Sequence, residues 1–233
     1  MRLRHLGAAL CFALLPTACE SGSSSSESAA LDTDDQKASY GIGRDMGTSL
    51  QPARNHLDMP AFMRGLEDAL AERESTISEQ ELQETLQRFS QTIMAEQQSE
   101  QAAMAETNLQ AGEAFLAENG AREGVVTTAS GLQYEVLREG DGPTPSAEDQ
   151  VRLHYRGTLI DGTEFDSSHG GDPVVFAVGR VITGFSEGLQ VMNVGGQYRL
   201  YIPGHLGYGL QGTGGVIGPN QLLIFEIELM GIE

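Results

Sequence analysis

The spacing of apolar residues divides the chain into a helical half and a strand-rich half. From residue 32 to residue 119, apolar side chains recur every three or four positions, which is the period of an amphipathic helix. Two short helices are expected first. A third is expected to begin at Ser78, because Ser78 and Glu81 have the spacing of a capping box. Since only one Gly and no Pro follow before Asn119, this third helix should span about 60 Å.

The middle of the long helix differs from its ends. Residues 95–107 contain only Ala and Met as apolar types, so residues 95–119 are expected to form an exposed connecting helix. Residues 32–94 have too few large side chains for a stable core of their own. They are interpreted as a helical dimerisation domain, in which a second copy supplies the missing contacts. A compact helical lid folded onto the C-terminal half is the alternative.

From residue 120 onward, Gly and Pro become frequent and apolar residues alternate with polar ones, which is typical of half-buried strands. Five such runs occur, at residues 132–136, 151–155, 174–178, 198–202 and 223–229. Residues 184–192 carry apolar side chains at helical spacing instead. The pattern predicts an α+β domain over residues 120–233, with a curved antiparallel β-sheet wrapped on one short helix.

The N-terminus has the pattern of an export signal. Two Arg residues precede a short apolar run at 6–15, and small residues lead to Cys19, which predicts a signal peptide over residues 1–18. Cleavage before Cys19 would leave either a free thiol or, because the segment resembles a bacterial lipobox, a lipidated first residue. The Ser-rich stretch within residues 19–31 is typical of a flexible tether. We therefore expect an exported bacterial protein, periplasmic or associated with the outer membrane as a lipoprotein.

Composition excludes several classes of function. The net charge of -19 disfavours binding to nucleic acid, whose phosphates are negative as well. No apolar stretch is long enough for a spanning helix, so membrane contact is expected only through a lipid anchor. The five His residues are scattered without metal-ligand spacing, and both Cys lie at residue 19 or before it. No pairing of a nucleophile with a base favours a hydrolase.

Four motifs in the C-terminal half resemble one known family. They are VRLHYRGTLIDGTEFDSS at 151–168, VITGFSEGL at 181–189, IPGHLGYG at 202–209 and LIFEIEL at 223–229. In order and spacing they are similar to the signature of the FK506-binding proteins (FKBPs), and the resemblance covers residues 125–233. Residues 32–120, which include GEAFLAEN at 112–119, resemble the N-terminal dimerisation region of the macrophage-infectivity-potentiator type of FKBP.

The resemblance implies a peptidyl-prolyl cis-trans isomerase that rotates X-Pro peptide bonds and assists the folding of exported proteins, with associated chaperone-like binding. The implied catalytic residues are Tyr155, Phe165, Asp166 and Tyr208. The implied substrate-binding residues are Phe176, Val181, Ile182, Phe185, Ile217 and Phe225. No cofactor and no metal is implied. The implied partners are proline-containing unfolded or peptide segments, a second copy of the chain and FK506-like macrolides.

The chemistry gives a reason for an aromatic pocket. Rotation breaks amide resonance at a cost of about 18–20 kcal/mol, and water stabilises the charge-separated planar ground state. A dry cleft removes that stabilisation. The resemblance points to the Tyr208 hydroxyl as donor to the twisted carbonyl, whereas Asp166 is expected to be structural because no proton moves. Two residues depart from the family: Phe185 replaces Trp, and Gly218 stands where Pro is common.

Two alternatives remain at this stage. Each aromatic residue could belong to ordinary core packing, and the domain could be a non-catalytic binding module that has kept the fold. The helical residues 32–119 lead to a further expectation. If residues 95–119 are an exposed spacer, removing residues 19–118 should leave isomerisation of short peptides nearly unchanged and lower only the catalysed refolding of whole proteins.

Overall fold

The computed structural model describes residues 29–233. The expected signal peptide, Cys19 and most of the Ser-rich tether lie outside the described residues. The chain forms two units that divide between Met59 and Pro60. Within residues 29–233, no helix is long and apolar enough to cross a membrane.

The first unit is built on one helix, α1 (Asp34–Ser49), followed by the 3-10 turn η2 (Gln51–Ala53). Thr33 is the N-cap of this helix and forms a capping box with Gln36. The Thr33 side chain accepts a hydrogen bond from the backbone of Gln36, and the Gln36 side chain accepts one from the backbone of Thr33. No residue of α1 is buried. A Cβ placed on Gly41, Gly43 or Gly47 of this helix would meet nothing within 4 Å.

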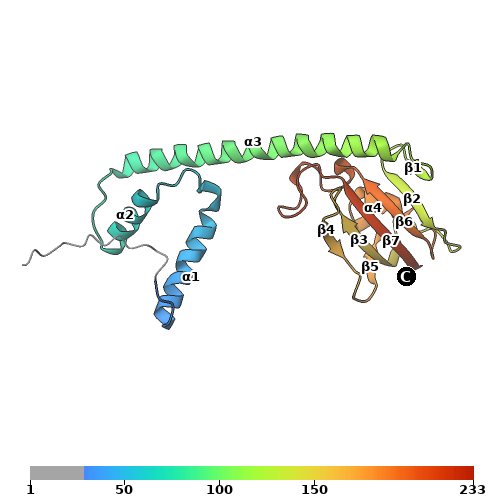
Figure 1. Cartoon of the computed structure of the whole chain (residues 1–233), viewed down its shortest axis with the longest axis horizontal. Helices are drawn as coiled ribbons and strands as arrows, with labels where there is room; N and C mark the ends of the chain where they lie inside the picture. Colours follow the sequence, from blue (N-terminus) through green and yellow to red (C-terminus); the bar gives the residue numbers. More distant parts are fainter. Residues whose placement is uncertain (1–28) are drawn as a thin grey trace, which may run out of the picture. The chain divides into compact units, whose positions relative to one another are not determined.

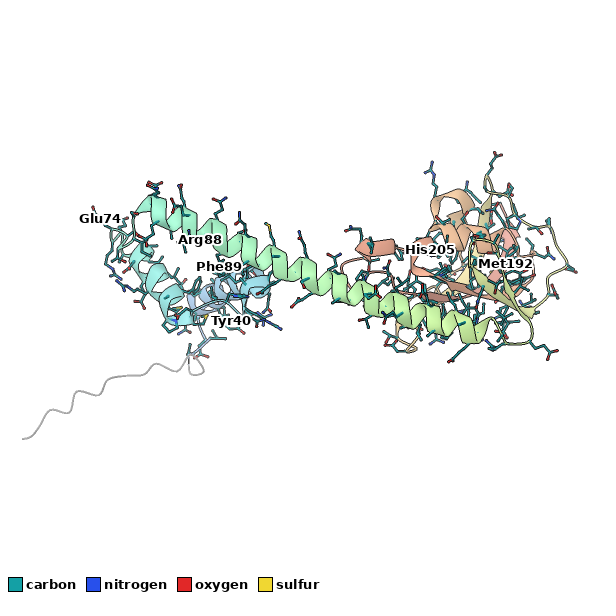
Figure 2. All side chains as sticks on the ribbon, turned by 90° about the horizontal axis from the view of Figure 1, so that it is seen from above. Tyr40, Glu74, Arg88, Phe89, Met192 and His205 are labelled. Atoms are coloured by element: carbon teal, nitrogen blue, oxygen red, sulfur yellow. The ribbon has the colours of Figure 1, made fainter. Side chains whose placement is uncertain are left out.

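The second unit opens with α2 (Met59–Leu70) and α3 (Glu79–Asn119). Pro60 occupies the first turn of α2, where its missing N–H has no helical partner. Ser78 is the N-cap of α3, and its hydroxyl accepts a hydrogen bond of 3.2 Å from the N–H of Glu81. The 41 residues of α3 form one continuous helix, as the sequence predicts, and Figure 2 shows it with Arg88 and Phe89 labelled near its start.

Seven strands follow, and they form one antiparallel sheet in the order β1-β2-β6-β7-β3-β4, with β5 also paired to β3 (Figure 1). Their bounds are β1 (Val125–Thr127), β2 (Gln133–Arg138), β3 (Gln150–Thr158), β4 (Glu164–Ser167), β5 (Val174–Ala177), β6 (Gln197–Ile202) and β7 (Leu223–Ile232). The five predicted strands are confirmed. The short strands β1 and β4 are additions that the sequence pattern does not show.

One short helix, α4 (Thr183–Leu189), covers the apolar face of the sheet. It lies close to β6 because two of its glycines face the strand: a Cβ on Gly184 would collide with Ile202, and a Cβ on Gly188 with Leu200. Phe185, between these glycines, is therefore held deep in the core. The α+β fold predicted from the sequence is confirmed. Three 3-10 turns complete the domain: η3 (Val178–Arg180), η4 (Gly204–Leu206) and η5 (Gly209–Gln211).

The C-terminal part of α3 differs from the expected exposed connecting helix. Residues 95–104 are exposed, but Ala105, Gly112 and Asn119 are buried. These three residues recur every seven positions, so they share one face of the helix. Their small or polar side chains let the helix lie against the sheet domain. On that face α3 is part of the domain surface from Ala105 onward.

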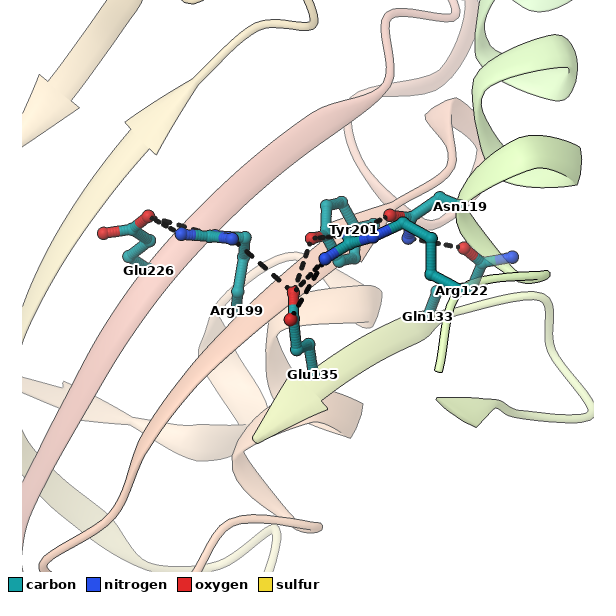
Figure 3. A network of polar contacts seen from close by, with 7 residues as sticks. All are labelled: Asn119, Arg122, Gln133, Glu135, Arg199, Tyr201 and Glu226. Carbon is teal, nitrogen blue, oxygen red and sulfur yellow. Dashed lines mark hydrogen bonds and ion pairs between the residues drawn. The ribbon is translucent and has the colours of Figure 1, made fainter. Parts of the chain in front are cut away.

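A polar network joins the end of α3 to the sheet (Figure 3). The buried amide of Asn119 donates to Gln133 of β2 at 2.9 Å, and Gln133 donates to the carbonyl of Leu116 at 2.9 Å. Arg122, just after the helix, binds Asn119, the hydroxyl of Tyr201 and the carboxylate of Glu135. The network therefore fixes the end of the helix to strands β2 and β6.

Candidate functional site

A pocket of about 520 Å³ opens beside α4, between β4, β5 and the loop that joins β6 to β7. Its lining residues are Phe165, Asp166, Phe176, Arg180, Val181, Ile182, Phe185, Tyr208, Thr213, Ile217 and Phe225. The volume lies within the usual range for small-ligand sites, and the lining is mostly apolar with a few polar groups at the edge.

Phe185 forms the floor of the pocket and is only 3% exposed. Its ring meets the rings of Phe225 and Phe176 edge-on, with centroid separations of 5.0 and 6.1 Å. Tyr155 also contacts Phe185 edge-on, at 6.3 Å. Edge-to-face pairs of this kind are favourable because the positive ring edge meets the negative ring face. The aromatic side chains thus form a closely packed apolar floor and wall.

A glycine makes this packing possible. Gly157 lies on β3, and a Cβ at that position would be 2.5 Å from Cε2 of Phe165 and 2.9 Å from Cε1 of Phe225. The two rings occupy the space where a side chain would be, with a centroid separation of 5.4 Å. Gly157 is therefore a supporting residue of the pocket. Sequence reasoning quoted it within a motif but gave it no role.

Tyr155 joins the buried floor to the polar edge of the pocket. Its hydroxyl donates a hydrogen bond of 2.5 Å to the carboxylate of Asp166. Burial of the ring, together with this bond to a carboxylate, raises the pKa of Tyr155 well above its usual range. Buried Ser168 fixes the backbone of the same residue: its hydroxyl accepts from the N–H of Tyr155 at 2.9 Å. The phenol is therefore neutral and firmly oriented at physiological pH.

Tyr208 stands at the open edge of the pocket, on the loop between β6 and β7, with 41% of its surface exposed. Within residues 29–233 no hydrogen bond to its hydroxyl is formed. The group can therefore donate to a ligand that enters the pocket. Ile217, from the same loop, is buried and forms part of the wall.

Nine of the ten residues singled out by the family resemblance line this one pocket. The tenth, Tyr155, lies behind the lining and contacts Phe176, Phe185, Phe225 and Asp166. Sequence reasoning missed Arg180 and Thr213, which also line the pocket. Neither residue carries a pattern that marks it as functional. Among the residues that the structure describes, no group of three or more His, Cys, Asp or Glu side chains could hold a metal ion.

Comparison with protein families gives two adjacent matches. Residues 35–136 match the domain amino terminal to FKBP-type peptidyl-prolyl isomerase, and residues 142–230 match the FKBP-type peptidyl-prolyl cis-trans isomerase domain. Together the two matches include every lining residue of the pocket. The first match extends past the end of α3 and includes β1 and most of β2, so the boundary between the two matches falls inside the sheet domain.

Whole-chain relatives agree with these matches. The chain is 41% identical over 201 residues to a probable FKBP-type peptidyl-prolyl cis-trans isomerase FkpA of Neisseria meningitidis, covering 84% of this chain and 74% of the relative. It is 35% identical to the outer membrane protein MIP of Legionella longbeachae, covering 95% of each. The crystal structure of FkpA from Escherichia coli superposes with a TM-score of 0.66 at 35% identity, covering 88% of this chain and 99% of that one.

Proposed function

Because the chain belongs to the FKBP-type peptidyl-prolyl cis-trans isomerases, we propose that it rotates X-Pro bonds in the aromatic pocket around Phe185, with Tyr208 as the hydrogen-bond donor. The observation that carries this assignment is the set of edge-to-face rings closed around Phe185, with one unbonded tyrosine hydroxyl at the opening. The floor takes the prolyl ring, and the opening takes the backbone on either side of it.

The geometry supports catalysis without any covalent step. The apolar rings exclude water from the amide and so remove the solvation that favours its planar form. As the amide twists, charge returns from the carbonyl oxygen to the nitrogen, so a fixed donor helps by holding the peptide carbonyl in the orientation of the twisted state. Tyr208 supplies such a donor from the rim. Phe165, Phe176, Val181, Ile182, Ile217 and Phe225 give the walls their shape.

The test is a protease-coupled isomerisation assay with the whole protein and short X-Pro peptides. Tyr208→Phe keeps the ring and removes only the hydroxyl, so we expect kcat/KM to fall about tenfold with the fold intact. Val175→Thr, at an exposed strand position outside the pocket, is the control and should leave kcat/KM unchanged. A folded wild-type protein that gives no acceleration would assign the pocket to peptide binding alone. Competition by FK506 tests whether macrolides occupy the same pocket.

For the N-terminal helices we propose a two-fold dimer. Large apolar side chains are exposed there: Tyr40, Ile42, Met59, Met63, Leu70, Leu82, Leu86 and Met94. Met46, Phe62 and Leu66 on the same helices are half-buried. Helices with this much exposed apolar surface are typical of interfaces, and twofold pairing is the commonest assembly. Sedimentation at micromolar protein concentration tests it, and a monomer would reject it.

For the location we propose export, with Cys19 lipidated and the protein held at a membrane by that anchor. The support is the basic and apolar start of the chain, the small residues before Cys19 and the Ser-rich stretch after it. Palmitate labelling of the wild type should be lost in Cys19→Ala, and that variant should move to the soluble fraction. Recovery of unlabelled wild-type protein that begins at Cys19 with a free thiol would reject lipidation.

A further inference from the structure

The loop between β6 and β7, residues 203–222, forms the open side of the pocket and is called the rim loop here. It supplies Tyr208, Thr213 and Ile217 to the lining. A loop of this length has a conformation that depends on what it packs against. The position of the Tyr208 hydroxyl therefore depends on the groups that hold the rim loop in place.

Three hydrogen bonds join the rim loop to α3. The Gln101 side chain donates to the carbonyl of Leu210 at 3.2 Å, and the Asn108 side chain donates to the carbonyl of Pro219 at 2.8 Å. In the opposite direction, Asn220 of the loop donates to the carbonyl of Ala105 at 3.4 Å. Each of the three bonds uses a backbone carbonyl as acceptor, so they fix the path of both backbones.

Small residues bring the two elements into contact between these bonds. A Cβ on Gly218 would be 3.1 Å from Nδ2 of Asn108 and 3.7 Å from Sδ of Met104. A Cβ on Gly112 would be 3.4 Å from Cβ of Leu222. A larger residue at position 218 would press on the Asn108 side chain. Gly218 thus leaves room for the helix at this part of the rim loop.

The contacts with α3 lie next to the residues that line the pocket. Asn220 donates its backbone N–H to the carbonyl of Gly209 at 2.7 Å, which ties it to the residue after Tyr208. Leu210 follows directly, and Ile217 is the neighbour of Gly218. Asn220 itself has φ of 52°, in the left-handed region. The helix therefore holds the rim loop at Leu210, between Tyr208 and Thr213, and again just after Ile217.

The helix is itself fixed where it ends. The network of Figure 3 joins Asn119 and Arg122 to Gln133, Glu135 and Tyr201 on the sheet. The ring of Phe115 lies tilted against the ring of Tyr201, with centroids 5.7 Å apart. The sheet also carries Phe165, Phe176 and Phe225 of the pocket wall, and the floor residue Phe185 of α4 packs in the same core. The helix thus bridges the sheet and the rim loop, and sets the distance between the two sides of the pocket.

We propose that α3 is a positioning element of the isomerase site, and that Gln101 and Asn108 place Tyr208 by holding the rim loop. The proposal rests on the assignment of the pocket made above. It replaces the expectation that the helix is a spacer whose removal leaves peptide isomerisation nearly unchanged. Loss of the helix would release the rim loop, so isomerisation of short peptides should fall as well.

The test uses the whole protein with the double variant Gln101→Glu, Asn108→Asp. Each change replaces a donor amide with an acceptor of the same shape, so both bonds to the rim loop are lost. The matched control is Gln97→Glu, Gln98→Glu, which makes the same charge change at exposed positions of the same helix. We expect kcat/KM on short X-Pro peptides to fall about fivefold to tenfold in the first pair only. Amide hydrogen exchange should become faster across residues 203–222.

A second readout distinguishes positioning from a general loss of structure. In a Tyr208→Phe background the hydroxyl is absent, so the Gln101→Glu, Asn108→Asp pair should lower kcat/KM by less than twofold. Asn220→Gly keeps the left-handed backbone and removes only the third bond, and should cause a smaller loss than the pair. The proposal would be overturned if the Gln101→Glu, Asn108→Asp pair and the control pair had equal kcat/KM and equal exchange. It would also be overturned if the pair lowered kcat/KM by the same factor in the Tyr208→Phe background as in the wild type.

The outcomes also separate this proposal from the assignment of the pocket. If Tyr208→Phe lowers isomerisation of the wild type and the helix pair does not, the pocket assignment stands and the positioning role is rejected. If Tyr208→Phe leaves kcat/KM unchanged, Tyr208 is not the donor, and the proposal that α3 acts by placing Tyr208 is rejected as well.

Discussion

The carboxylate of Asp166 on β4 accepts a hydrogen bond of 2.5 Å from the hydroxyl of Tyr155 on the neighbouring antiparallel strand β3. Its second oxygen accepts the backbone N–H of Ser167 at 2.9 Å. Both oxygens therefore already have partners within the protein. This arrangement agrees with a structural role for Asp166, in which the carboxylate orients the phenol behind the pocket wall.

A double-mutant cycle on this pair tests that role. Tyr155→Phe and Asp166→Asn should each lower kcat/KM several-fold, because each removes the charged hydrogen bond that orients the ring. The double variant should be little worse than either single one, since the same contact is lost in each. The measurement is kcat/KM for a short X-Pro peptide, with folding checked by circular dichroism. Effects that multiply fully would show that the two residues act separately.

The raised pKa of Tyr155 predicts a pH dependence of stability. Burial, aided by the Asp166 carboxylate, keeps this hydroxyl protonated in the folded state above pH 10.0, the ordinary pKa of Tyr, at which it ionises in the unfolded chain. The unfolded state then binds fewer protons than the folded state, so stability falls as pH rises. This contribution is complete below about pH 10 and is lost above it. Tyr155→Phe should therefore weaken the alkaline decrease in unfolding free energy.

The measurement is denaturant unfolding at several pH values between about 8 and 11. Tyr40→Phe is the control, because this tyrosine lies on α1 and its side chain is exposed. The control should follow the wild-type curve. If the unfolding free energies of Tyr155→Phe and of the wild type fall in parallel above pH 10, the raised pKa of Tyr155 contributes nothing to stability.

The strands and the pocket could be predicted from the sequence because their signals are local. Alternation of apolar and polar residues predicts strands such as β3, where Leu153 and Tyr155 point inward and Arg152 and His154 do not. Eight of the ten residues that the family resemblance implies lie within four ungapped motifs, so their family pattern is visible without a structure; Phe176 and Ile217 lie between the motifs. The fold of residues 120–233 follows from these two kinds of signal.

The docking of α3 could not be predicted in the same way. Its buried face is formed by Ala105, Gly112 and Asn119, with Asn108 half-buried between them. These residues are small or polar, so a search for large apolar side chains reads the same stretch as exposed. Gln101 and Asn108 bind backbone carbonyls of the rim loop, and the identity of those partners leaves no trace in the sequence. The short strands β1 and β4 were missed for a related reason, because they are too short to show alternation.

A larger residue at position 185, on the floor of the pocket, should change the affinity for FK506. Phe185→Trp adds apolar area at a site closed by three edge-on rings, and the family resemblance gives Trp as the usual residue there. We expect tighter binding of FK506, by about threefold to tenfold, with stability changed by less than about 2 kcal/mol. Because the chain contains no Trp, the variant also gains a single fluorescent reporter for titration. Weaker binding in a stable variant would show that the rings cannot admit the indole.

A substitution at Gly157, which does not itself line the pocket, should lower both stability and activity. In Gly157→Ala the new methyl group would meet the rings of Phe165 and Phe225, so we expect a loss of about 1–3 kcal/mol in unfolding free energy and a clear loss of kcat/KM. Gly171→Ala is the matched control, since a Cβ there has no contact closer than 3.8 Å. Denaturant unfolding measures both. Equal stability of the two variants would show that the rings move aside at no cost.

If the exposed apolar side chains of α2 and α3 form the dimer interface, disrupting it should affect the catalysed refolding of whole proteins but not the isomerisation of short peptides. Met63 and Leu86 are 44% and 57% exposed, and both lie far along the chain from the pocket residues. Met63→Glu with Leu86→Glu places charges in the proposed interface, where they would be desolvated, so the dimer should dissociate. Sedimentation should then show a monomer. Isomerisation of short peptides should be unchanged, because residues 101–119 of α3 and their contacts with the domain remain.

Catalysed refolding of a whole protein should respond differently in this variant. A dimer carries two pockets on one assembly, so an unfolded chain released from one pocket meets the other at raised effective concentration. The monomer loses that advantage, and its catalysis of a proline-limited refolding reaction should fall several-fold at equal pocket concentration. Arg64→Glu with Arg88→Glu changes charge on the same helices without adding charge at apolar positions, and serves as the control. A monomer that refolds the protein as fast as the wild type would reject a role of dimerisation in catalysis.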